Sequence, residues 1–217
     1  MRPRFDLILV TDGAPALLAR LTRLAPALSE RVAILLRDKQ AGLAALAEQA
    51  RELRTLTRRH GTALLISQHV ELALACDADG VQLPDAPPTA PDLLEAASLA
   101  LERARAQLGS ARVLGASRHN LAGVLAAAHA GADYATLSPI LASPGKGEPL
   151  GIGALAEAAR ATSMPLFALG GVSAVHVAAL CAAGAAGIAV IREVLAAPDP
   201  THALRVLGDA LNTGRSS

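Results

Sequence analysis

Eight short apolar runs recur along the 217-residue chain, each separated from the next by a segment with helical character. The runs lack polar alternation, which is typical of parallel strands covered on both faces. Alternating strands and helices predict a parallel sheet, and eight repeats predict its closure. We therefore predict a single-domain α/β fold, a (β/α)₈ TIM barrel with parallel strands, over residues 1–211, followed by a tail over 212–217. The predicted strands are 6–11, 32–36, 63–66, 80–83, 113–116, 134–137, 165–169 and 187–191.

A repeated turn supports this fold. Similar segments that contain Ala and Gly lie at 75–81, 130–134 and 183–188. Asp79, Asp133 and Ala186 occupy equivalent positions in them, and these positions are 54 and then 53 residues apart. Such a period holds two strand–helix units. No G-x-G-x-x-G follows the first predicted strand, which weakens an open dinucleotide-binding sheet as the alternative.

Composition excludes several classes of partner. The net charge is +1 and aromatic residues make up 1% of the chain, so neither a basic patch nor a stacking platform for nucleic acid is predicted. The uncharged stretch 163–191 is broken by proline and glycine, so we predict no membrane span. Sparse charge on a chain that is 52% hydrophobic favours a homo-oligomer.

The two cysteines bear on the cellular compartment in which the chain is expected. Cys76 and Cys181 lack any C-x-x-C or Cys/His spacing, and both fall in Ala/Leu-rich helical patterns. We interpret them as buried small residues. A reducing, cytoplasmic location fits this cysteine use.

A diglycine marks a candidate phosphate site. It directly follows the seventh predicted strand, where bare backbone lets a ligand approach main-chain N–H groups. The loops after the last two strands of a TIM barrel often form a phosphate pocket. Tight turns are the alternative explanation of the glycines. The predicted phosphate-binding residues are Gly170, Gly171, Val190, Ile191, Arg192 and, from a Gly/Pro/Ser loop over the mouth, Lys146.

Other polar residues follow the remaining predicted strands, at the rim where TIM barrels carry their active sites. Arg37 and Lys39 share one face by strand alternation, which favours a cationic pair in the pocket, although a solvated turn around Asp38 is possible. Converging cations imply an anionic, phosphorylated small molecule as partner. The predicted substrate-pocket residues are Ser67, His69, Gln82, Ser138 and Ser143.

His119 follows the fifth predicted strand directly. A histidine there is either a surface residue at a helix start or a general acid/base, because its ordinary pKa of about 6.5 allows both protonation states near neutrality. The carboxylates near the mouth form no close cluster in the sequence pattern, so we predict no metal site.

The pattern resembles a known family, the thiamine phosphate synthase and TenI-like superfamily of small (β/α)₈ barrels. The resemblance covers nearly the whole chain. It rests on LILVTD (7–12), ILLRDK (34–39), VELALACDADGVQLP (70–84), LGASRHNL (114–121), AGADYATLSPI (130–140) with Lys146, PLFALGGVS (165–173) and AAGAAGIAVI (182–191).

The resemblance implies two activities. The synthases join a pyrimidine pyrophosphate to a thiazole phosphate with Mg²⁺, and their motifs carry Asn-Asp-Arg where this chain has Ser67, Gln68 and His69, and a second metal Asp where it has Pro87. The TenI-like branch moves a proton on a thiazole carboxylate phosphate without a metal. Its proton-transferring histidine matches His119, and its phosphate cradle matches Gly170, Gly171 and the backbone of 190–192.

Our leading hypothesis from sequence is the TenI-like tautomerase, with His119 as acid/base, Arg37 and Lys39 stabilising negative charge, and no cofactor. The first alternative is a divergent thiamine phosphate synthase, which would require Mg²⁺. The second is a non-catalytic binding or regulatory protein that retained the phosphate pocket.

Overall fold

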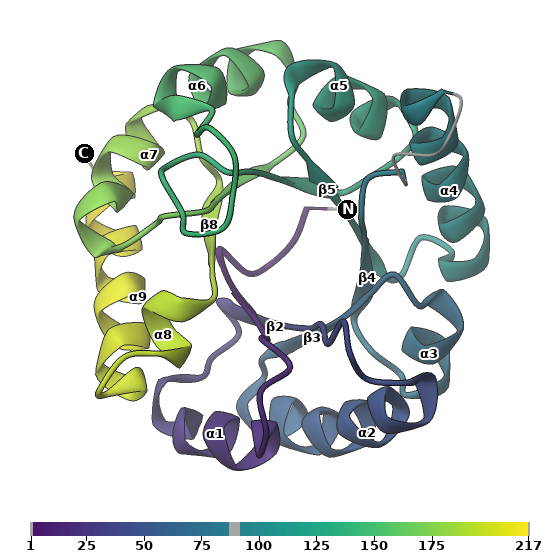
Figure 1. Cartoon of the computed structure of the whole chain (residues 1–217), viewed down its shortest axis with the longest axis vertical. Helices are drawn as coiled ribbons and strands as arrows, with labels where there is room; N and C mark the ends of the chain where they lie inside the picture. The colour runs from purple at the N-terminus through teal and green to yellow at the C-terminus, as the bar shows by residue number, and fades with distance from the viewer. Residues whose placement is uncertain (1, 87–91, 217) are drawn as a thin grey trace.

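Eight parallel strands close into one barrel, in the order β1 to β8, with helices around the outside (Figure 1). This computed structural model describes residues 2–86 and 92–216. The predicted TIM barrel is confirmed, and each predicted strand agrees with an observed one to within two residues at either end. The strands are β1 (Leu7–Val10), β2 (Val32–Leu36), β3 (Ala63–Ser67), β4 (Gly80–Leu83), β5 (Val113–Arg118), β6 (Tyr134–Leu137), β7 (Leu166–Leu169) and β8 (Gly187–Val190).

Helices follow the strands and cover the barrel. They are α1 (Leu17–Arg23), α2 (Leu43–His60), α3 (Val70–Ala75), α4 (Leu93–Leu108), α5 (Leu121–His129), α6 (Gly151–Ala161), α7 (Val177–Ala182), α8 (Arg192–Leu195) and α9 (Pro200–Ser216), with 3₁₀ turns η1 (Ala25–Ala27) and η2 (Ala174–His176). Helix α9 continues through residues 212–216, most of the segment assigned to a tail from sequence. None of the helices in the described residues could cross a membrane.

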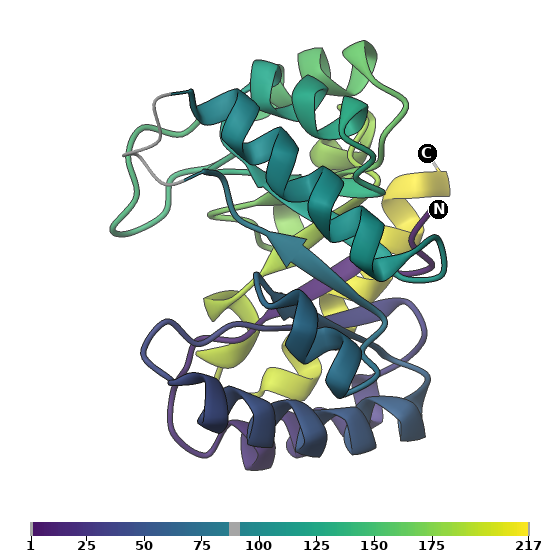
Figure 2. The ribbon, with the colours of Figure 1, turned by 90° about the vertical axis from the view of Figure 1, so that its right-hand side faces the viewer.

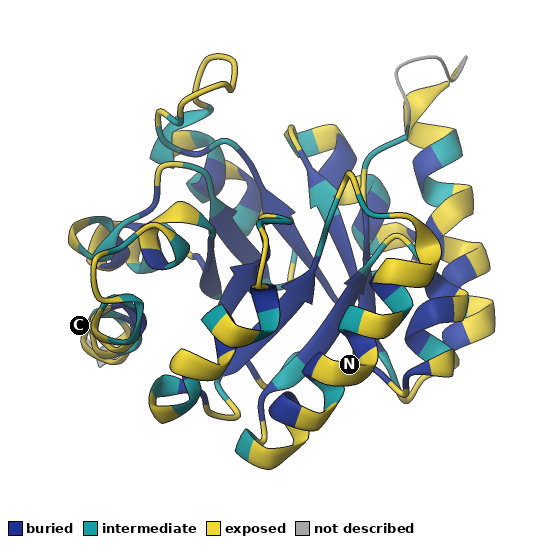
Figure 3. Cartoon of the chain, turned by 60° about the horizontal axis from the view of Figure 1, so that its bottom comes forward, coloured by how far each residue is buried: buried dark blue, intermediate teal, exposed yellow. Residues whose placement is uncertain are grey.

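The strands are mostly buried (Figure 3), and strand alternation divides their side chains between two hydrophobic cores. In β1, Leu7 and Leu9 pack outward against the helices, while Ile8 and Val10 pack inside the barrel. Three aromatic rings fill the interior toward the N-terminal ends of the strands. Phe5, Tyr134 and Phe167 meet with ring centroids 5.2–5.8 Å apart. The barrel is therefore a packed core and not a pore.

The helices begin and end where local chemistry predicts. The Asn120 side chain accepts a hydrogen bond from the Gly123 N–H (2.7 Å) and so caps α5, and the Asp92 carboxylate does the same for α4. Gly61 and Gly184 adopt left-handed conformations after α2 and α7. These caps fix the loops that connect each helix to the next strand.

The two rims of the barrel differ in position and content. Both chain termini lie at the rim formed by the N-terminal ends of the strands, and the loop after β6 projects at the opposite rim (Figure 2). At this N-terminal rim the repeated turn has a structural role. Asp79 accepts hydrogen bonds from the Leu64 N–H and from Arg54, and Asp133 likewise from the Leu114 N–H and Arg105. Each aspartate thus joins a helix to the start of a strand.

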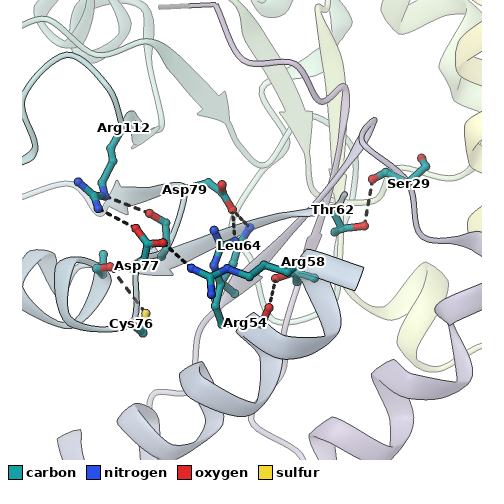
Figure 4. A network of polar contacts seen from close by, with 12 residues as sticks. Ser29, Arg54, Arg58, Thr62, Leu64, Cys76, Asp77, Asp79 and Arg112 are labelled. Carbon is teal, nitrogen blue, oxygen red and sulfur yellow. Dashed lines mark hydrogen bonds and ion pairs between the residues drawn. The ribbon is translucent and has the colours of Figure 1, made fainter. Parts of the chain in front are cut away.

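Further pairs extend this network. Arg58 and Arg112 both bind Asp77 (Figure 4), and Arg31 and Arg215 both bind Asp6. Arg54, Asp77, Asp79 and Arg112 line a hollow of about 590 Å³. The paired arginines and aspartates of the network largely neutralise one another, which indicates a stabilising role for this rim.

Candidate active site at the C-terminal rim

Two hollows open at the C-terminal rim, which we call the mouth. The first, the basic hollow, has a volume of about 380 Å³ and is lined by residues including Arg37, Asp38, Lys39, Ser67, Gln68 and His69. The second, the diglycine hollow, has a volume of about 460 Å³ and is lined by residues including Thr11, Asp12, Arg37, Ser143, Lys146, Gly170, Gly171, Val190, Ile191 and Arg192. Arg37 lines both, so the two hollows adjoin at one cation.

The diglycine supports the loop above it. Gly170 and Gly171 both have positive φ, +96° and +67°. A Cβ at Gly171 would lie 2.4 Å from the Ala142 carbonyl oxygen, and the Leu141 N–H donates to the Gly170 carbonyl (3.0 Å). The glycines are therefore required by the turn and by the packing of the β6–α6 loop. Their bare backbone also lines the hollow, so the turn interpretation does not exclude a phosphate site, which stays a prediction.

A side-chain contact crosses the diglycine hollow. Arg192, at the start of α8, donates from Nη2 to the Ser143 hydroxyl (3.2 Å), which lies in the β6–α6 loop. Lys146 lines the same hollow from that loop. Together with Arg37 they give this hollow three cationic side chains, which suits a phosphate ligand.

Local hydrogen bonds shape the basic hollow. Buried Thr11 donates from its hydroxyl to the Arg37 carbonyl and accepts from the Arg37 N–H, both at 2.8 Å. Asp38 accepts from the backbone N–H groups of residues 40 and 41 (2.9 and 3.1 Å), which occupies its Oδ1 within the turn. Gln68 has a positive φ of 59°, a strained conformation of the kind that clusters at functional sites.

His119 lies at the same mouth, outside the lining of the two hollows. Its Nδ1–H donates a hydrogen bond to the Ser138 carbonyl (2.6 Å). A carbonyl oxygen can only accept, so the proton of the neutral ring lies on Nδ1 and Nε2 carries none. Nε2 lies 3.8 Å from an Asp85 carboxylate oxygen. The imidazole, about half exposed, is thus held with its basic nitrogen available.

Gln82 lies deeper than a surface pocket residue. Its amide nitrogen donates to the hydroxyls of Ser117 (2.7 Å) and Thr136 (3.2 Å), and its carbonyl accepts from the Tyr134 hydroxyl (2.7 Å). Burial raises the pKa of Tyr134, so the phenol stays protonated as a donor. A side chain at Gly115 would collide with the Tyr134 ring. This satisfied network forms the floor of the mouth.

Arg118 is a site residue that sequence reasoning missed. Although charged, it is 1% exposed, and it binds the Asp85 carboxylate (3.1 Å) and the Ser117 carbonyl (2.7 Å). Burial lowers the pKa of Arg118, while Asp85 opposes that change. The signal in the sequence was a charged residue at the end of a largely apolar run. The structure adds that Gly123, in α5, packs against this residue, because a Cβ at Gly123 would lie 3.0 Å from the Arg118 side chain.

The residues present do not fit a Mg²⁺ site of carboxylates. Within residues 2–86 and 92–216, no three His, Cys, Asp or Glu side chains form a group that could hold a metal ion. Positions 67–69 supply Ser, Gln and His, and Asp85 is occupied by Arg118. Pro87, at the second carboxylate position of the resemblance, lies outside the described residues.

Comparisons with known proteins identify the family. The family model described as thiamine monophosphate synthase matches residues 7–194. A protein of Geobacter sulfurreducens is 40% identical over 205 residues, 93% of this chain and 85% of that protein. The thiamine-phosphate synthase of Methanoregula boonei is 36% identical and covers 98% of this chain and 95% of its own length.

A solved structure agrees with these relatives. The thiamine phosphate pyrophosphorylase of Pyrococcus furiosus superposes with a TM-score of 0.81 at 28% identity, over 98% of both chains. The Methanoregula boonei relative is named as a synthase and the Pyrococcus furiosus structure as a pyrophosphorylase, and neither is named as a tautomerase, the activity that led from sequence. The resemblance drawn from the motifs is confirmed, and this chain belongs to the thiamine monophosphate synthase family.

Proposed function

We propose that this chain is a transferase of thiamine biosynthesis that joins a pyrimidine pyrophosphate to a thiazole phosphate. One observation carries the proposal: two cation-lined hollows adjoin at one mouth and share Arg37. A reaction between two phosphorylated substrates needs two anion sites side by side, whereas an isomerisation needs one. The names of the full-length relatives support the same reaction.

Each hollow takes one substrate in this proposal. The diglycine hollow holds the thiazole phosphate through the backbone at Gly170 and Gly171 and the side chain of Lys146. The basic hollow holds the pyrophosphate, with Arg37 and Lys39 as counter-charges. As the bond from the pyrimidine-bearing carbon to the pyrophosphate oxygen breaks, the electron pair leaves with pyrophosphate, and the thiazole supplies the pair for the new bond.

The protein contributes placement and charge. Fixing the two substrates together makes the joining step effectively unimolecular. Arg37, beside both hollows, stabilises the negative charge that grows on the leaving group, and such preorganised charge lowers the barrier. No proton needs to be removed by His119 in this reaction.

The test is a direct assay of the two substrates, measuring pyrophosphate release and the joined product by chromatography. We expect turnover in the wild type, a large loss in Arg37→Ala and retained turnover in His119→Ala. Arg2→Ala is the matched control, because Arg2 is an exposed arginine at the opposite rim. Binding of both substrates without any product would support the non-catalytic alternative and contradict the transferase.

A second candidate is the tautomerase, favoured by the geometry of His119. The Ser138 carbonyl fixes the proton on Nδ1 and leaves Nε2 as a base at the mouth. This activity requires one phosphate site and His119. Proton exchange on a thiazole carboxylate phosphate that is abolished in His119→Ala, with no joining activity in the wild type, would establish it instead.

A further inference from the structure

The carboxylates at the mouth are already engaged by the protein. Asp12 forms an ion pair with Arg20 (2.8 Å), which lowers the pKa of the Asp12 carboxyl. Asp38 accepts from two backbone N–H groups of its own turn, and Asp85 binds Arg118. A hard divalent cation needs several oxygen ligands, and each of these carboxylates already has at least one oxygen engaged by the protein.

Asp85 is paired with a buried cation. Its partner, Arg118, is 1% exposed at the end of β5 and also donates to the Pro84 and Ser117 carbonyls. Loss of the Asp85 charge would leave this buried guanidinium without the carboxylate that pairs with it among the described residues, which is strongly destabilising. A divalent cation at Asp85 would lie close to the Arg118 guanidinium and be repelled by it, so Arg118 disfavours metal coordination by this carboxylate.

The cations at the mouth show the opposite pattern. In the parts of the chain that the structure describes, the side chains of Arg37, Lys39 and Lys146 form no ion pair with a carboxylate. Arg192 contacts only the neutral hydroxyl of Ser143 in the same parts. Positive charge is therefore left available where the proposed reaction places a pyrophosphate and a phosphate.

We propose that side-chain cations replace the divalent metal in this chain, so that pyrophosphate is bound and released as a leaving group without Mg²⁺. Arg37 and Lys39 carry the counter-charge in the basic hollow, and the buried Arg118 disfavours a metal ion at Asp85. This inference rests on the proposed transferase for its substrate. Its binding component can be tested without turnover.

The first experiment measures binding of inorganic pyrophosphate by calorimetry in buffer containing EDTA. We expect saturable binding by the wild type, at least tenfold weaker binding by Lys39→Met, and unchanged binding by the control Arg2→Ala. Binding that appears only after Mg²⁺ is added overturns the proposal. So does binding that is equal in wild type and Lys39→Met.

The second experiment titrates the protein with Mn²⁺ alone and follows the free ion by electron paramagnetic resonance. We expect no stoichiometric binding in the wild type. One bound equivalent that is lost in Asp85→Asn would identify Asp85 as a metal ligand and overturn the proposal. Asp85→Asn keeps an acceptor for Arg118, and circular dichroism establishes that the variant is folded before it is compared.

The third experiment measures joining activity in EDTA and with added Mg²⁺. We expect the two rates to agree within about threefold, and a drop of tenfold or more in EDTA that Mg²⁺ restores would contradict the inference. Absence of activity under both conditions, with pyrophosphate still bound in EDTA, would reject the transferase and leave metal-independent anion binding standing. The two proposals can thus fail separately.

Discussion

The two rims of this barrel differ in what their arginines border. At the N-terminal rim, Arg54, Arg58, Arg105 and Arg112 each meet an aspartate, and the pairs join helices to the starts of strands. At the mouth, Arg20 and Arg118 are paired as well, but Arg37 has no carboxylate partner among the described residues and borders two hollows. The larger hollow lies at the N-terminal rim. An unpaired cation shared by two hollows, more than hollow size, therefore marks the candidate active site.

The strongest test of this comparison removes Arg37. We expect Arg37→Ala to lower kcat/KM for the joining reaction roughly 100-fold, about 2.7 kcal/mol of transition-state stabilisation, because one cation serves both anion sites. Stability should change little, since the side chain has no ion pair to lose. Steady-state kinetics and urea unfolding measure the two effects. If Arg37→Ala lowered the stability but retained the activity, Arg37 would have a stabilising role and our assignment of the mouth as the active site would be contradicted.

The matching change at the other rim is Asp133→Ala. Its side chain is 5% exposed and accepts from Arg105 and from the Leu114 N–H, so its loss leaves that N–H without its acceptor and Arg105 without its carboxylate. We expect the free energy of unfolding to fall by about 3 kcal/mol. Measured at a temperature where the variant is folded, kcat/KM should stay within about twofold of wild type. A selective loss of activity would show that this rim also takes part in function.

A smaller effect is expected from Gly171→Ala. The new Cβ meets the Ala142 carbonyl, and alanine resists the positive φ, so the loop must shift at a cost of about 1–2 kcal/mol. Binding of thiazole phosphate, measured by calorimetry, should weaken about tenfold. Gly147→Ala is the control in the same loop, because a Cβ there meets nothing within 4 Å. Equal effects of the two changes would remove the special role of the diglycine.

The smallest effect concerns the ion pair at the mouth. Arg20 lowers the pKa of Asp12 from its ordinary value of 3.8, so the pair stabilises the fold at neutral pH and its contribution is lost as pH falls through the lowered pKa. Because the pair is partly exposed and screened, Asp12→Asn should cost only about 0.5 kcal/mol at pH 7. Urea unfolding should show this difference shrinking below pH 3.8. If the stability difference between wild type and Asp12→Asn grew as the pH fell, the ion pair would not be stabilising the fold in the way proposed.

The sequence was most informative where one physical rule decides the outcome. Fully buried strands leave continuous apolar runs, and the predicted 32–36, 80–83 and 134–137 match the observed strands residue for residue. The phosphate-binding residues after β7 and β8 likewise line one hollow, because the loops that follow parallel strands meet at one rim. Their roles toward a ligand stay predictions.

The direction of each polar side chain, and the partner that it binds, could not be predicted from the sequence by such a rule. Ser117 and Arg118 are adjacent in the chain. The Ser117 hydroxyl accepts a hydrogen bond from Gln82, whereas the buried Arg118 side chain pairs with Asp85. The surroundings of each side chain depend on residues of other elements: Tyr134 of β6 packs against Gly115, and Gly123 of α5 packs against Arg118. The choice between synthase and tautomerase was likewise not settled by motifs, and the named relatives shifted it toward the synthase.

The aromatic cluster of Phe5, Tyr134 and Phe167 has a consequence for kinetics. It closes the barrel interior toward the N-terminal ends of the strands, so ligands can reach the candidate site only from the mouth. In the proposed transferase, both substrates would enter there and the larger product would leave there before the next pair binds. The order of binding and release would then contribute to the turnover rate alongside the chemical step.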